Sequence, residues 1–77
     1  MNVPKNPNHT ELRDGHWYSI VLRYPRAHHH AKWVAAQEWF VWQGTSETKI
    51  VPSVEVDEIL HEVDPAALDP AIVRDLV

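Results

Sequence analysis

The feature that most constrains the fold is a run of four large apolar residues from Trp39 to Trp42. All four tryptophans of the 77-residue chain lie between Trp17 and Trp42, so this stretch must hold most of the core. A strand over the run would place large side chains on both faces of a sheet, because successive side chains of a strand alternate. One face would pack on the core, and the second would need a covering segment or a partner.

A chain this short has room for one small core, because the fraction of surface that folding can bury falls with size. We expect residues 1–10 to form a flexible N-terminal arm and residues 11–77 to form a single small domain. The chain contains no cysteine, so neither disulfides nor thiolate metal sites can stabilise it. Its stability must come from apolar packing or from a partner subunit.

Charge and hydropathy restrict the location and the partners. No apolar run approaches the roughly 20 residues that span a bilayer, and the first residues lack the apolar core of a secretion signal. We therefore expect a cytoplasmic protein without a membrane partner. Residues 1–44 carry five basic and three acidic side chains, whereas residues 45–77 carry two basic and eight acidic ones. This charge disfavours nucleic acid as a partner.

The clearest strand is the segment 17–24, which is rich in aromatic and β-branched residues. Alternation predicts that four of its side chains share one face: Tyr18, Ile20, Leu22 and Tyr24. A turn is predicted before this strand at Asp14-Gly15, because glycine readily adopts positive φ angles. Pro25 should end the strand, and residues 26–30 should form a polar connection.

Residues 31–42 fit two interpretations. Their alanine, lysine, glutamine and glutamate content favours a helix, whereas the aromatic residues suit a hairpin that turns near residues 37–38. Helical spacing from Trp33 spreads Trp39 and Trp42 around the cylinder and leaves no apolar stripe. We therefore favour the hairpin, with strands at 32–36 and 39–43.

The C-terminal third contains weaker signals. Residues 49–51 form a short candidate strand closed by Pro52, and residues 54–63 mix the period of a strand with that of a helix. Pro70 follows an acidic residue that can cap a helix, so residues 70–76 should form a short docked helix. The apolar residues that this helix would bury are Ile72, Val73 and Leu76.

These segments together predict a mainly β fold of the α+β class. It is a small antiparallel meander of three to four strands, partly curled, with a short C-terminal helix.

A loose pattern covers residues 15–60. It consists of Gly15-His16-Trp17-Tyr18, Trp33-Val34-Ala35-Ala36, Trp39 with Gly44, and Val56-Asp57-Glu58-Ile59. In order and spacing this pattern resembles the short tryptophan-rich proteins of unknown function encoded by bacteriophages and prophages. The chain departs from that family at the second turn, where Gln37-Glu38 replaces the usual glycine. The resemblance implies a small antiparallel β fold and a phage or prophage origin, and it implies no activity.

Three consecutive histidines, His28 to His30, form the most conspicuous polar cluster. On an extended strand His28 and His30 would point the same way and could hold a transition metal with a more distant third ligand. We favour an exposed polar loop that becomes positive below about pH 6.5. The sequence thus predicts no cofactor, and His28 and His30 remain the alternative metal ligands.

The sequence lacks the motifs of common catalytic sites. None of Ser19, Ser46 and Ser53 has a Gly-x-Ser-x-Gly context, and no glycine-rich loop precedes a helix. We therefore expect that the protein is not an enzyme.

The remaining expectation is a non-catalytic protein-binding module, encoded by a phage or prophage, that acts on a host or phage protein. Aromatic and arginine side chains are typical of interface centres. The candidate partner-binding residues are therefore Trp33, Trp39, Trp42, Arg23 and Arg26. The sequence also allows a homodimer. The alternative function is a His-based metal-binding or nucleic-acid-contacting module.

Overall fold

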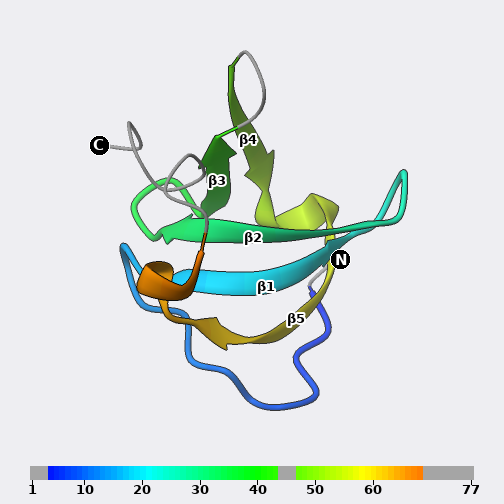
Figure 1. The fold of residues 1–77 in the computed structure, drawn as a ribbon. Coiled ribbons are helices and arrows are strands. Elements are labelled where there is room, and N and C mark those ends of the chain that lie inside the picture. Colours follow the sequence, from blue (N-terminus) through cyan, green and yellow to red (C-terminus); the bar gives the residue numbers. More distant parts are fainter. Residues whose placement is uncertain (1–3, 44–46, 69–77) are drawn as a thin grey trace.

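The computed structural model describes residues 4–43 and 47–68. Within these ranges the chain forms a five-stranded antiparallel sheet with the strand order β4-β3-β2-β1-β5 (Figure 1). The strands are β1 (Trp17–Leu22), β2 (Ala27–Val34), β3 (Trp39–Gln43), β4 (Thr48–Pro52) and β5 (Val56–Val63). The described helical structure consists of two 3-10 turns, η1 (Ser53–Glu55) and η2 (Pro65–Ala67). The prediction of a mainly β fold is therefore confirmed.

The predicted number of strands, three to four, is wrong because β5 forms a fifth. Strands β1 to β4 follow one another as a meander, and η1 then returns the chain to the free side of β1. The register between β1 and β5 shifts twice, so β5 contains extra residues at two β-bulges. These extra residues put the buried side chains of Val56 and Ile59 three positions apart, which imitates a helical period. The predicted helix at 70–76 lies outside the described residues.

The hairpin predicted for residues 31–42 is confirmed. β2 and β3 pair with Trp33 opposite Phe40, and four turn residues connect them. Glu38 closes this turn by donating its N–H to the carbonyl of Ala35 (3.2 Å). Its φ angle of 57° lies in the left-handed region, which costs about 1–2 kcal/mol for a residue other than glycine. The turn therefore closes without a glycine, at an energetic cost.

The core lies on one face of the sheet, which bends over it. Figure 1 shows β3 and β4 standing at a steep angle to β1, β2 and β5. All the strands except β4 contribute to the buried cluster, and β4 adds a half-buried valine. The buried members are Tyr18, Ile20, Ala31, Trp33, Phe40, Val56 and Ile59. The rings of Trp33 and Phe40 pack with their centroids 4.8 Å apart.

Two predictions around the first turn are wrong. β1 ends at Leu22, so Tyr24 does not extend its face but lies in the turn 23–26. The polar connection predicted for residues 26–30 is also incorrect, because β2 begins at Ala27 and includes the three histidines. Pairing with the apolar strand β1 draws these polar residues into the sheet.

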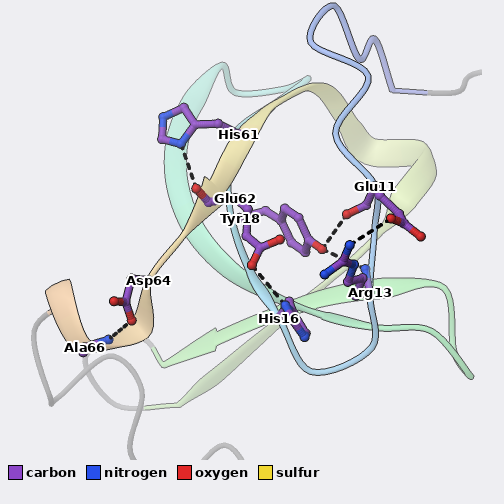
Figure 2. A network of polar contacts seen from close by, with 8 residues as sticks. All are labelled: Glu11, Arg13, His16, Tyr18, His61, Glu62, Asp64 and Ala66. Atoms are coloured by element: carbon purple, nitrogen blue, oxygen red, sulfur yellow. Dashed lines mark hydrogen bonds and ion pairs between the residues drawn. The ribbon is translucent and has the colours of Figure 1, made fainter.

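The segment before β1 is anchored by the hydroxyl of Tyr18, whose side chain is fully buried. The hydroxyl donates to the carbonyl of Glu11 (2.7 Å) and accepts from the N–H of Arg13 (2.7 Å; Figure 2). Burial raises the pKa of Tyr18, so its hydroxyl remains protonated and able to donate further into the alkaline range than that of an exposed tyrosine. Leu12, between the two anchored residues, packs against the core.

We predict that Tyr18→Phe lowers the free energy of unfolding by about 1–3 kcal/mol, because two backbone groups lose their partner. Urea unfolding followed by tryptophan fluorescence measures this change. Tyr24→Phe is the matched control, since Tyr24 is 92% exposed and should show no effect. Equal stability of the two variants would contradict the anchoring role.

Candidate functional site

The 3-10 turn η1 brings together residues from three distant parts of the chain. Its first residue is tied to the β2–β3 turn, since the N–H of Ser53 donates to the carbonyl of Glu38 (3.1 Å). Its last residue is tied to the β1–β2 turn, since the N–H of Arg23 donates to the carbonyl of Glu55 (2.9 Å). η1 therefore connects the start of β3, where Trp39 lies, with the turn that carries the two arginines.

A hollow of about 370 Å³ lies where η1 meets the turn 23–26. Its lining residues are Arg23, Tyr24, Val54 and Glu55. Among the described residues, three large hydrophobic side chains are strongly exposed, and two of them line this hollow. Tyr24 is 92% exposed and Val54 is 52% exposed. Clustered apolar exposure of this kind is typical of a surface that binds another molecule.

Arg23 forms one wall of this hollow and is held in place by backbone carbonyls. Its Nε donates to the carbonyl of Val54 (3.2 Å), and its Nη2 donates to the carbonyl of Val56 (3.1 Å). These bonds run from the turn 23–26 to η1 and the start of β5. They fix the position of Tyr24, the next residue, relative to Val54.

Arg26 forms ion pairs with two carboxylates at the start of β5. Its Nη1 lies 2.5 Å from an oxygen of Asp57, and its Nη2 lies 2.9 Å from an oxygen of Glu58. The guanidinium of Arg26 lowers the pKa of Asp57, which therefore stays ionised further into the acidic range than an exposed aspartate. Arg23 also pairs with Asp57, at 3.5 Å. The carboxylates offset the positive charge of the arginines, which weakens the attraction of this surface for phosphates.

The three tryptophans proposed from the sequence as partner-binding residues lie in different environments. Trp33 is 8% exposed and belongs to the core. Trp42 is half-buried against that core and stacks on His29, with ring centroids 4.4 Å apart. Trp39 is half-buried and lies opposite Pro52, the residue that precedes η1. Of the three, Trp39 is the one whose strand position pairs with a direct neighbour of η1.

The proposed binding residues therefore fall into two groups. The structure brings Arg23, Arg26 and Trp39 to the two sides of η1, whereas Trp33 belongs to the core and Trp42 packs against it. Sequence reasoning missed Tyr24 because alternation continued the strand through it. The proline at position 25 is the signal that could have placed Tyr24 in a turn, where a side chain has few neighbours.

His28 and His30 lie side by side on β2, on the face opposite the core. Their ring centroids are 5.0 Å apart in an edge-to-face arrangement. His30 lies opposite Ser19 on β1, and Ser19 lies opposite His61 on β5, so three imidazole side chains share this face. In the described part of the chain, no group of three histidine or carboxylate side chains is placed to hold a metal ion.

Ser19 and His28 form a hydrogen bond between the serine Oγ and the histidine Nε2. A serine beside a histidine is the pairing that activates a nucleophile in many hydrolases, where the hydroxyl must reach the substrate. Ser19 is only 1% exposed. The bond therefore satisfies a buried hydroxyl group and does not present a nucleophile.

A second hollow, of about 400 Å³, lies between the start of β1 and the end of β5. His16 Nδ1 and Glu62 Oε2 lie 3.0 Å apart at its rim (Figure 2). Asp64 at the same rim accepts a hydrogen bond from the N–H of Ala66 (2.9 Å) and so caps η2. An exposed ion pair such as that between His16 and Glu62 contributes little to the stability of the fold. His16 and Glu62 bind each other at this hollow, and none of its lining residues is among the large hydrophobic side chains that are strongly exposed in the described residues.

Comparison with protein-family models, with curated protein sequences and with solved structures finds no significant match for this chain. Over residues 4–43 and 47–68, no helix has the length and apolar composition needed to cross a membrane. The function must therefore be inferred from the structure itself.

We predict that the free energy of unfolding falls as the pH drops through 6.5. The pKa values of His29 and His30 are lowered from 6.5, mainly by burial and then by the neighbouring histidines. The unfolded chain, with ordinary histidine pKa values, therefore binds protons first. This contribution to stability is fully present above pH 6.5 and is lost below it.

Urea unfolding at about pH 7.5 and at about pH 5.5, on either side of the ordinary histidine pKa, measures the loss. The double variant His29→Gln/His30→Gln should lose less stability between these two pH values than the unmodified chain. An equal loss in both proteins would show that other groups cause the dependence.

Proposed function

We propose that this chain is a non-catalytic protein-binding module and that its binding surface is centred on η1. The observation that carries the proposal is the exposure of Tyr24 beside Val54 at a single hollow. A tyrosine supplies a large, rigid contact area together with a polar hydroxyl, which is why tyrosine is frequent among the residues that dominate binding energy. A protein with a protruding apolar side chain fits the space between these two residues.

The surroundings of the hollow support this choice. Binding surfaces commonly combine an apolar centre with a polar rim. Here Tyr24 and Val54 form the centre, and the ion-paired Arg23 and Arg26 lie at the rim. On the other side of η1, the half-buried Trp39 pairs with the exposed Pro52. The arginines and one of the three tryptophans named from the sequence thus belong to the proposed surface.

The biological setting is part of the same proposal. The resemblance of residues 15–60 to short phage and prophage proteins supports a phage or prophage origin. We infer that the module acts in the cytoplasm on a host or phage protein. The ion pairs that offset Arg26 support a protein partner over nucleic acid.

We predict that a photo-crosslinking amino acid at position 24 captures the partner in cells, because Tyr24 is almost fully exposed. Mass spectrometry of the crosslinked product identifies the partner, which is then purified. Tyr24→Ala should weaken its binding at least about tenfold, as expected for a residue that dominates an interface. Isothermal titration calorimetry measures this difference.

Ile50 provides the matched control, since it is 52% exposed but lies on β4, away from the hollow. A crosslinker at position 50 should not capture the same protein, and Ile50→Ala should bind it like the unmodified chain. Unchanged binding by Tyr24→Ala would exclude the η1 surface. A product that contains two copies of this chain would identify a homodimer instead.

A further inference from the structure

Residues 4–10 cover the outer edge of β5, the edge that does not face β1. The N–H of Lys5 donates to the carbonyl of Asp57 (2.8 Å), and the carbonyl of Lys5 accepts from the N–H of Ile59 (2.8 Å). These two bonds form a parallel bridge between Lys5 and Glu58. The segment before β1 thus adds one rung of a parallel ladder to an antiparallel sheet.

Side chains of the same segment bind β5 one residue further along. Asn8 donates from its amide nitrogen to the carbonyl of Leu60 (2.6 Å), and the hydroxyl of Thr10 lies 3.4 Å from the same oxygen. The side chain of Asn6 bonds to both the carbonyl and the N–H of Thr10 (2.7 and 2.8 Å). This internal closure holds the donors of Asn8 and Thr10 in position.

The carbonyls that accept these bonds belong to the two β-bulges of β5. Pairing with β1 skips Asp57 between Val56 and Glu58, and it skips Leu60 between Ile59 and His61. A bulge residue has no partner in the neighbouring strand, so its backbone groups require another partner. Asp57 and Leu60 therefore present acceptors on the outer edge, and residues 4–10 satisfy them.

We propose that the outer edge of β5 is a docking site for an extended segment of a partner protein, and that residues 4–10 occupy this site in cis. The site accepts a backbone N–H at Asp57, donates the N–H of Ile59 and accepts a side-chain amide at Leu60. Backbone pairing of this kind does not depend on the side chains of the incoming segment, so a second segment can replace the first.

The chemistry of the preferred segment follows from the cis occupant. Lys5 contributes, after Arg26, to the lowered pKa of Asp57, so a basic residue suits the position opposite Glu58. A side-chain amide donor suits the position three residues later, where Asn8 reaches Leu60. This edge is a different surface from the Tyr24–Val54 hollow, so the proposal goes beyond the function proposed above.

The probe is a fluorescein-labelled peptide with the sequence of residues 1–10, and the protein is the full chain. Lys5→Pro in the protein removes the N–H that binds Asp57 and so releases the edge from its cis occupant. Fluorescence anisotropy should then show roughly tenfold tighter peptide binding than with the unmodified chain. The reason is that residues 4–10 of the variant no longer compete with the peptide for the edge of β5. Lys5→Ala is the matched control, since it keeps the N–H and should change binding much less.

Amide hydrogen exchange of Ile59, followed by NMR, locates the binding. Exchange should be faster in the Lys5→Pro protein than in the unmodified chain, and the peptide should slow it again. Asn8→Ala keeps every backbone bond. It should also speed the exchange of Ile59 and tighten peptide binding, but less than Lys5→Pro does. A peptide that itself carries Lys5→Pro should not slow the exchange.

Two results would overturn the proposal. The first is equal peptide affinity of the unmodified and Lys5→Pro proteins, with Ile59 exchange unaffected by the peptide. The second is a two-chain mass of the unmodified protein in sedimentation that becomes a one-chain mass in Lys5→Pro. That result would assign the edge to the arm of a second copy rather than to a different protein. Neither result depends on Tyr24, so the function proposed for η1 is tested separately.

Discussion

A single sheet can bury an apolar face only by bending over it, and this constraint determines the rest of the structure. β3 and β4 stand steeply against the other strands, which closes the inner face around Trp33, Phe40 and Tyr18. The bend brings the end of β4 close to the start of β5, so the three residues of η1 suffice to join these two edge strands. That turn, with its exposed Val54, comes to lie against the β1–β2 turn and its exposed Tyr24. The proposed binding surface is thus a result of how the core is closed.

The sequence allowed the β class, the hairpin of β2 and β3 and the short strand β4 to be predicted, because alternation and turn residues are local signals. It did not reveal β5, since bulges at Asp57 and Leu60 break the alternation. The histidines of β2 were assigned to a connection because polar residues enter a strand only when its neighbour supplies the pairing. Such pairing is a property of the folded chain.

The candidate site was predictable only in part. Arg23 and Arg26 were identified by their residue type, and in the structure Arg23 lines the hollow of Tyr24 and Val54 while Arg26 lies in the same turn. Trp33 was assigned to the same surface because the sequence cannot show which face of a hairpin turns inward. Tyr24 was assigned to the strand because it continues the alternation of residues 17–24, and its exposure beside η1 depends on Val54, which is 30 residues away along the chain. Contacts at such separations arise only from the complete topology.

Pro52 has a consequence for the aggregation behaviour of the chain. It ends the edge strand β4 and carries no N–H, so a neighbouring molecule cannot add an uninterrupted strand there. At the opposite edge, the bulges of β5 disturb the regular spacing that fibril growth requires. Both borders of the sheet are therefore irregular. This irregularity disfavours edge-to-edge association between copies of a sheet that is rich in β-branched and aromatic residues.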